Sequence, residues 1–326
     1  MKKLNYRQTQ QLAKEVLKEE SAAIEGLCDR VDDHFIQACE ILLNCAGRIV
    51  VIGIGKSGHI GRKIAATLAS TGSPAFFVSA AEASHGDLGM VCTDDTILIL
   101  SNSGQSDEIL ALLPSLKRLG VNVIALTGNP NSVLASSSQF NIDVSVAREA
   151  CPLGLAPTTS TAAMLAMGDA LAISLLNARG FNEQDFAQSH PGGKLGKRLL
   201  IKVSDIMHTG EQIPSVNLDN SLKKGLLEVS SKGLGMTTVV DHENKLLGIF
   251  TDGDLRRALD KGMDVNNTSM GDVMISDCKV AYAHQLAAEI LEEMERMRIN
   301  SLPVIDDNNC VIGALNMHDI LKAGIV

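Results

Sequence analysis

The sequence has no excess of basic residues, since 29 lysines and arginines stand against 38 aspartates and glutamates and the net charge is −9. The charges are spread along the chain, which argues against a nucleic-acid-binding or anionic-membrane surface. An anionic ligand must therefore be held by local groups. The stretch Met1–Gln11 has no apolar core of signal-peptide length, and no apolar run approaches the roughly 20 residues of a membrane span. We expect a soluble, cytoplasmic protein with no membrane or nucleic-acid partner.

Cysteine pairs of the kind that bind zinc or build a disulfide framework are also missing. The seven cysteines are scattered and odd in number, and none of them forms a C-x-x-C pair. Reduced thiols are therefore expected. What the sequence does have is length and apolar content: 326 residues, 45% of them hydrophobic, suffice for two folded regions with a sizeable core.

The first half of the chain changes from a helical to an alternating pattern. Residues 6–46 predict two amphipathic helices, because apolar residues recur there at helical spacing. Short apolar runs then alternate with helical stretches, which predicts an α/β fold with a doubly wound, parallel five-stranded sheet. Such a sheet binds ligands at the carboxyl ends of its strands. The predicted strands are Ile49–Ile54, Ala75–Val78, Thr96–Leu100, Val121–Leu126 and Ile142–Val146.

An internal repeat appears after Pro191-Gly192-Gly193. Ser204–Met207 is echoed by Gly271–Met274, and Leu247–Leu255 is echoed by Ile312–Ile320. Two copies are too few for a solenoid, so we predict a tandem pair of α+β character that buries one shared core. The predicted domains are residues 1–203, 204–262 and 271–326.

A glycine-rich turn, Gly53-Ile54-Gly55-Lys56-Ser57-Gly58, follows the first predicted strand and opens a helix. It formally matches both a P-loop and a dinucleotide-binding turn. A P-loop needs glycine where Val50 stands, and a dinucleotide site needs an acid after the next strand, where Glu82 is the remaining candidate. The better interpretation is an anion site made by backbone N–H groups and Ser57, with Lys56 as a nearby cation. A bare turn without a ligand is the alternative.

A second polar turn, Ser101–Glu108, ends the third predicted strand and starts a helix. Hydroxyls and backbone N–H groups converge there, and Gly104 allows close approach of the backbone, as a phosphate bound without metal requires. An ordinary turn with a helix cap is the alternative. Two such turns predict a phosphorylated ligand. The titratable groups that follow strands or lie in loops are His85, Glu108, Glu149 and His190.

Several segments together resemble the bacterial arabinose-5-phosphate isomerase family. They are Gly55–Gly61, Glu82–Met90, Ser101–Gly104, Glu149–Thr158 and Ser189–Gly193. The resemblance covers nearly the whole chain and implies a flavodoxin-like sugar-isomerase (SIS) domain followed by two CBS motifs. It also implies a homotetramer, without a required cofactor, that interconverts D-arabinose 5-phosphate and D-ribulose 5-phosphate through an enediolate for the Kdo branch of lipopolysaccharide biosynthesis.

The resemblance assigns candidate residues to the site. Ser79 stands where the family often has a zinc-associated histidine, so no metal is expected, and Gln105 stands where some members have glutamate. The candidate catalytic residues are Lys56, Glu108, Glu149 and His190. The candidate substrate-binding residues are Ser57, Gly72, Ser73, His85, Ser101, Ser103 and Ser106.

Aldose–ketose isomerisation requires ring opening and proton transfer between neighbouring carbons. We expect the serines to hold the phosphate and Lys56 to stabilise the enediolate. His190 or His85 would assist ring opening, and Glu149 would move the proton, with Glu108 as the alternative base. The rival functions are a non-catalytic phosphosugar sensor and an isomerase of another sugar phosphate, such as a hexulose phosphate.

The repeat predicts either an effector site or an assembling module. Thr251 and Asp254 stand where CBS domains often hold ribose, and Asn316 replaces the threonine in the second copy. A nucleotide or nucleotide-sugar effector is the ligand class expected. The candidate ligand residues are Thr251, Asp254, Asp272 and Asp319.

Overall fold

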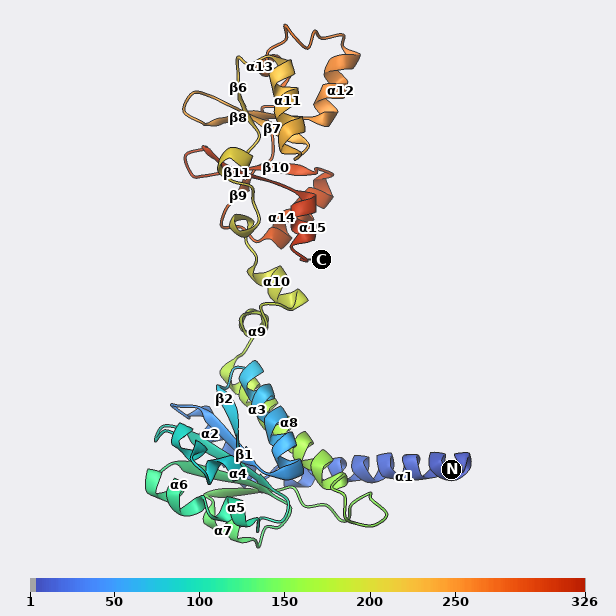
Figure 1. Ribbon diagram of the computed structural model, residues 1–326, viewed down its shortest axis with the longest axis vertical. Coiled ribbons are helices and arrows are strands. Elements are labelled where there is room, and N and C mark those ends of the chain that lie inside the picture. Colours follow the sequence, from blue (N-terminus) through green and yellow to red (C-terminus); the bar gives the residue numbers. More distant parts are fainter. Residues whose placement is uncertain (1–3, 326) are drawn as a thin grey trace. The chain divides into compact units, whose positions relative to one another are not determined.

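The chain folds into two compact units that divide after Ser189, in a computed structural model that describes residues 4–325 (Figure 1). Residues 1–3 and 326, at the ends of two predicted domains, lie outside the described residues. The division comes earlier than the boundary predicted at residue 203, because α10 (Lys194–Leu200) is joined to the second unit. Arg198 of α10 pairs with Glu292 at 2.8 Å. The three domain ranges stay predictions.

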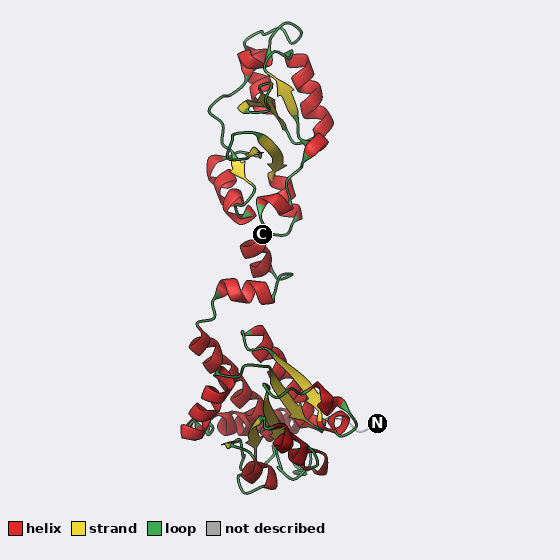
Figure 2. Ribbon diagram, turned by 90° about the vertical axis from the view of Figure 1, so that its left-hand side faces the viewer, coloured by secondary structure: helices red, strands yellow, loops and turns green. Residues whose placement is uncertain are grey.

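The first unit is built on a parallel five-stranded sheet in the order β2-β1-β3-β4-β5. Figure 2 shows this sheet between layers of helices. The predicted α/β class and doubly wound topology are confirmed. The strands are β1 (Ile49–Gly53), β2 (Ala75–Ser79), β3 (Thr96–Ser101), β4 (Asn122–Thr127) and β5 (Phe140–Asp143).

Two α-helices precede this sheet, as predicted for residues 6–46, further helices connect its strands, and α8 and α9 follow the last strand. In chain order they are α1 (Tyr6–Glu25), η1 (Cys28–Arg30), α2 (Asp33–Leu43), α3 (Gly55–Ser70), α4 (Ala80–Ala83), η2 (Asp87–Met90), α5 (Asp107–Leu110), α6 (Leu113–Leu119), α7 (Val133–Ser137), α8 (Thr159–Arg179) and α9 (Glu183–Ser189).

The core lies on both faces of the sheet because its strands are apolar on both sides. On one face, Leu98 and Leu100 of β3 pack with residues of α2, α3 and α8. On the other, Ile97 and Ile99 pack with residues of α4, α5, α6 and α7. Burying one such side chain contributes about 1.5–3 kcal/mol. The two buried layers fix the strand ends in space, and the site depends on those ends.

Two details of the first unit differ from the sequence predictions. The fifth strand was expected at Ile142–Val146, but pairing with β4 runs over Phe140–Asp143. The strand ends there because the Asp143 carboxylate accepts the Ser145 N–H at 2.8 Å, which turns the chain. The helix α8, with a mean hydropathy of 1.4, is also long and apolar enough to cross a membrane, which the sequence interpretation missed. Half of its apolar window is buried in the core.

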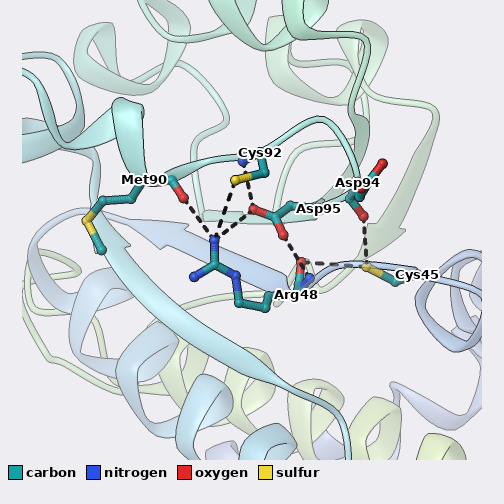
Figure 3. Close-up of polar contacts among 6 residues, drawn as sticks. All are labelled: Cys45, Arg48, Met90, Cys92, Asp94 and Asp95. Atoms are coloured by element: carbon teal, nitrogen blue, oxygen red, sulfur yellow. Dashed lines mark hydrogen bonds and ion pairs between the residues drawn. The ribbon is translucent and has the colours of Figure 1, made fainter.

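A polar cluster joins the amino ends of β1 and β3, at the edge of the sheet opposite the strand carboxyl ends (Figure 3). Asp95, only 3% exposed, accepts the N–H groups of Arg48 at 2.8 Å and Cys92 at 2.9 Å. It also faces the Arg48 guanidinium at 3.4 Å, and that guanidinium stacks on Phe76. Burial raises the pKa of Asp95, but these hydrogen bonds outweigh it and hold the pKa below its usual range.

The second unit contains two three-stranded sheets with the same topology, as the repeat predicted. In each, one parallel and one antiparallel pairing flank the central strand. The first copy contains η3 (Val203–Asp205), η4 (Gly210–Gln212), β6 (Ser215–Asn217), α11 (Leu222–Lys232), β7 (Met236–Val240), β8 (Leu246–Thr251) and α12 (Asp252–Asp260). The second contains α13 (Met270–Val273), β9 (Ala281–Tyr282), α14 (Ala287–Met297), β10 (Ser301–Ile305), β11 (Val311–Asn316) and α15 (Met317–Lys322).

In each copy, the segment that precedes the first strand pairs with the sheet of the other copy. His208 pairs with Ala314 of β11, through N–H···O bonds of 2.8 and 3.1 Å. Ile275 pairs in the same way with Ile249 of β8, at 2.8 and 3.0 Å. These pairings hold the two copies together as one unit.

Candidate active site

The strand order places the two polar turns side by side. The chain runs from β1 to β2 on one side of β1 and then crosses to β3 on the other side, so the topological switch point lies between β1 and β3. Ligands of open α/β sheets bind at this point, outside the carboxyl ends of the strands. Both turns begin at these ends, one after Gly53 and one after Ser101.

The first turn is closely packed because its glycines have no Cβ. A Cβ on Gly53 would lie 3.1 Å from the Gly58 nitrogen, and a Cβ on Gly61 would lie 3.0 Å from the Phe77 ring. Gly55, with φ of +56°, starts α3 in the left-handed region that glycine tolerates. Lys56 is exposed and Ser57 is partly buried at the first turn of this helix. The glycines bring α3 onto the sheet, and the helix N-terminus presents the lysine and serine.

The second turn is organised by its own hydroxyls. The Ser101 oxygen, in a residue only 2% exposed, accepts the Gly104 N–H at 3.0 Å, and the Ser103 oxygen accepts the Gln105 N–H at 3.2 Å. Gly104 has a φ of +61°, and a Cβ there would clash with the Ser132 side chain. Ser103 is exposed and Ser106 partly exposed. The hydroxyl oxygens of Ser101 and Ser103 are therefore held by hydrogen bonds within the turn itself.

Two titratable candidates flank these turns. Glu108 is exposed in the first turn of α5, directly after the second polar turn. His85 is exposed after α4, which begins where β2 ends at Ser79. Both lie in connections that leave the carboxyl ends of strands, as predicted. Within residues 4–325, no group of three or more histidines, cysteines and acids is placed to hold a metal ion.

Glu149 is bound to the N-terminus of α8. Its Oε2 accepts the Thr158 N–H at 2.8 Å, the Thr158 hydroxyl at 3.1 Å and the Ser160 N–H at 3.3 Å. Its Oε1 accepts the Ser160 hydroxyl. Burial raises the pKa of Glu149, but these hydrogen bonds outweigh it and hold the pKa below its usual range. The carboxylate is therefore ionised and oriented at neutral pH.

Gly72 and Ser73 lie away from the carboxyl ends of the strands, and His190 lies outside the first unit. Gly72 and Ser73 precede β2, at the opposite edge of the sheet. Ser73 is buried and accepts a hydrogen bond from Arg179 at 3.2 Å, while Gly72 packs against Phe181. His190 is the first residue of the second unit. The substrate contacts assigned to Gly72 and Ser73 and the catalytic role assigned to His190 stay predictions.

The sequence interpretation missed Thr158 and Ser160 as partners of Glu149. A signal was present, because Thr158, Thr159 and Ser160 precede a long apolar run, and hydroxyl residues there are typical of a helix N-terminus. What the sequence did not show was that the capped helix end receives a carboxylate from nine or more residues upstream.

The carboxylates predicted to bind a CBS ligand are engaged in helix capping. Asp254 accepts the Thr251 N–H at 2.9 Å and hydroxyl at 2.7 Å, and it pairs with Arg257. Asp272 caps α13 with Ser269 in the same way. Asp319 accepts the Asn316 N–H at 2.9 Å and lies 3.1 Å from His208. Their ligand roles stay predictions.

A cavity of about 650 Å³ lies between the two copies. Thr251 lines it, together with equivalent residues from the two copies, such as Gly233 and Arg298. Both of these end a helix in the left-handed region, with φ of 70° and 57°. Left-handed backbone is uncommon for a residue other than glycine, so Arg298 occupies a position where its backbone is strained.

The fold and the two turns define an α/β domain with polar turns at its switch point, followed by a tandem α+β repeat. Residues 42–174 match the SIS domain family, and residues 203–261 and 270–325 match the CBS domain family. An Escherichia coli CFT073 protein, c3406, solved in complex with arabinose 5-phosphate, is 44% identical, with a TM-score of 0.56 over 58% of this chain and 100% of its own. A Listeria monocytogenes protein, named for a proposed sugar-phosphate isomerase activity, is 30% identical, with a TM-score of 0.57 over 58% of this chain and 100% of its own.

Full-length relatives identify the family. An arabinose 5-phosphate isomerase, KdsD, of Pseudomonas aeruginosa is 57% identical over 307 residues, which are 94% of each chain. The KdsD of Escherichia coli K12 is 53% identical over 317 residues, 97% of this chain and 96% of the relative. The chain belongs to the KdsD arabinose 5-phosphate isomerase family, and it is an isomerase.

Proposed function

We propose that this chain interconverts D-arabinose 5-phosphate and D-ribulose 5-phosphate. The observation that carries the proposal is the pair of polar turns at the switch point between β1 and β3. Their N–H and hydroxyl groups suit a phosphate group. The relatives named as arabinose 5-phosphate isomerases, and the structure solved with that sugar phosphate, support this substrate. A role in the Kdo branch of lipopolysaccharide biosynthesis, in the cytoplasm, is part of the proposal.

The proposed reaction divides the work among residues of the first unit and His190. The hydroxyls of Ser57, Ser101, Ser103 and Ser106, with the N–H groups of both turns, hold the phosphate. Once the ring is open, with His85 or His190 assisting, Glu149 takes the proton from C2 of the aldose, and Lys56 stabilises the resulting enediolate. The proton then returns to C1, while the C2 hydroxyl loses its proton to the carbonyl oxygen of C1. Glu108, beside the phosphate turn, would orient groups or serve as the alternative base.

A coupled assay tests the proposal. Appearance of ribulose 5-phosphate is measured with arabinose 5-phosphate and with a panel of pentose, hexose and hexulose phosphates. We expect arabinose 5-phosphate to have the highest kcat/KM. Preference for a hexulose phosphate would replace the substrate, and binding without turnover would favour a phosphosugar sensor.

A homotetramer is the proposed assembly. In the described chain, residues 4–325, α1 buries none of its side chains, and Leu12, Leu17 and Ile24 are exposed along it. Leu155, in the loop before α8, is 81% exposed. A second copy would bury these apolar groups, which favour association. Light scattering on the full chain measures the mass, and Leu17→Glu should lower it if α1 is at the interface.

The cavity between the CBS copies is the proposed site of a nucleotide or nucleotide-sugar effector. Its volume suits a nucleoside, and the strained Arg298 supplies a guanidinium for a phosphate. Isothermal calorimetry with adenine and cytidine nucleotides measures binding. Arg298→Gly introduces the residue type that the first copy has at the equivalent position, Gly233. This change should abolish binding of the phosphate-bearing ligands while leaving the fold intact.

A further inference from the structure

The two carboxylate oxygens of Glu149 have different hydrogen-bond partners at the N-terminus of α8. A carboxylate offers about two acceptor sites on each oxygen. Oε2 accepts three hydrogen bonds, from the Thr158 N–H, the Thr158 hydroxyl and the Ser160 N–H. Within residues 4–325, Oε1 has one donor, the hydroxyl of Ser160. Oε2 is therefore occupied, and Oε1 has room for one more proton or donor.

Ser160 is held in place by the packing of α8. It is 1% exposed in the first turn of α8, a 21-residue helix that packs in the core of the first unit. The neighbouring Thr159 hydroxyl accepts the Ala150 N–H at 2.9 Å, so the backbone beside Glu149 is bound to the same helix end. Because core packing fixes α8, its first turn gives the carboxylate one orientation.

A hydroxyl also suits a carboxyl group that gains and loses a proton. The Ser160 oxygen donates one hydrogen bond and accepts up to two, so it can donate to the ionised Oε1 and accept from the protonated form. A backbone N–H can only donate, which favours the ionised form alone. The two oxygens thus have different partners within residues 4–325: Oε2 accepts two backbone N–H groups and the Thr158 hydroxyl, whereas Oε1 accepts the Ser160 hydroxyl alone.

We propose that Ser160 is a positioning residue of the isomerase reaction, which holds the Glu149 carboxylate so that Oε1 exchanges the substrate proton while Oε2 stays bound to α8. This inference rests on the proposed role of Glu149 as the base. Ser160 acts through Glu149, whose ionised form its hydroxyl stabilises.

The titratable neighbours of Glu149 along the chain are Arg148 and Cys151. Arg148 is paired with Glu19 of α1, a helix that packs beside α8. The pKa of Cys151 is lowered by N–H groups of its own loop, at Ala156, Leu155, Leu153 and Gly154. The hydrogen bonds that lower the pKa of Glu149 come from Thr158 and Ser160, so a change at Ser160 acts on it directly.

The test is the pH profile of kcat/KM for the full-length enzyme and three variants. Ser160→Ala removes the hydroxyl, Ser160→Thr restores it, and Thr161→Ala is the matched control, since that hydroxyl donates to the Thr158 carbonyl and not to Glu149. A hydrogen bond to a charged group favours the ionised form roughly tenfold or more. For Ser160→Ala we expect the acidic limb to move to higher pH and the plateau kcat to fall about tenfold, with KM within about twofold. Ser160→Thr and Thr161→Ala should behave like the wild type.

The outcomes separate this inference from the role of Glu149 itself. Glu149→Gln is measured beside the others. If it retains turnover, Glu149 is not the base and both ideas fall. If it is inactive while the Ser160→Ala profile superimposes on the wild type, or while Thr161→Ala shows the same changes as Ser160→Ala, Glu149 keeps its role and the positioning role of Ser160 is refuted. Circular dichroism melting of each variant excludes unfolding as the cause of lost activity.

Discussion

Replacing Glu149 by glutamine should separate catalysis from structure, because the surroundings accept the amide. The glutamine oxygen can take the place of Oε2 and keep the donors of Thr158 and the Ser160 N–H. Its NH₂ group then faces the Ser160 hydroxyl, which can turn to accept. What is lost is the charge at the N-terminus of α8, which contributes about 0.3–2 kcal/mol. For a unit of this size, we expect the melting temperature to fall by about 1–8 °C.

Turnover should fall far more than stability does. The amide retains the shape of the carboxylate but cannot take a proton from carbon, and removing a general base typically lowers kcat on the order of 10² to 10⁴-fold. Affinity for inorganic phosphate and for the substrate should change little, because the phosphate turns follow β1 and β3 and do not involve Glu149.

Three measurements check this expectation. The coupled assay gives kcat and KM, calorimetry gives affinity, and the wild-type reaction in D₂O reports the proton path, since a carboxylate that exchanges with water labels the product at C1 whereas a hydride shift does not. Glu108→Gln, the same change in the same unit, is the control. Near-normal turnover of Glu149→Gln, together with inactive Glu108→Gln, would refute the assignment and make Glu108 the base.

Three further predictions concern metal, the second unit and pH. Activity should survive exhaustive treatment with EDTA, because the phosphate turns offer N–H and hydroxyl donors; loss of turnover that a divalent ion restores would contradict this. Truncation after residue 203 should leave a folded isomerase with measurable activity, because every candidate catalytic residue precedes that point; a folded but inert fragment would show that the CBS pair completes the site. Asp95→Ala should lower the free energy of unfolding by about 3 kcal/mol, since it removes the acceptor of two backbone N–H groups and of Arg48. Because the pKa of Asp95 is lowered in the folded state, this contribution is present above about pH 4 and is lost as the pH falls through the folded-state pKa, so urea melts of wild type and variant should converge in acid.

Much of the fold could be predicted because local patterns carry it. The apolar runs that became β1 to β4 begin and end within one or two residues of the predicted limits, and β1, β3 and β4 are buried on both faces. The turn at Gly53–Gly58 follows from the lack of side chains where α3 approaches the sheet. The prediction of the fifth strand was less accurate, because the end of this strand depends on one hydrogen bond that the Ser145 N–H donates to the Asp143 carboxylate, which periodicity does not show.

The site could be predicted only where its residues form part of a strand-end motif. Ser101 ends β3, and Lys56 and Ser103 come shortly after β1 and β3, so their placement at one edge of the sheet follows from parallel topology. The contacts of Ser160 and Gly72 do not follow from the strand topology. The partner of Ser160 is a carboxylate from the preceding loop, and Gly72 lies at the far edge of the sheet against Phe181. A residue type in a motif does not reveal which side chain it touches across the chain.

In the second unit, the residues that the two copies share are largely explained by folding. A Cβ on Gly313 would lie 2.6 Å from the Met207 sulfur, and one on Gly248 would lie 3.1 Å from the Met274 sulfur, so each copy's methionine requires the other's glycine.

The shared acids are explained in the same way. Asp254 and Asp319 complete capping boxes at equivalent helix starts, with Thr251 and Asn316 as N-caps. These symmetric positions already have structural partners. The positions where the copies differ must therefore set the orientation in which a ligand binds the cavity. Arg298 faces the same cavity as its counterpart Gly233, and His318 faces it as the counterpart of Gly253. The asymmetric pairs, rather than the repeated motif, are therefore the residues through which the CBS pair would select an effector.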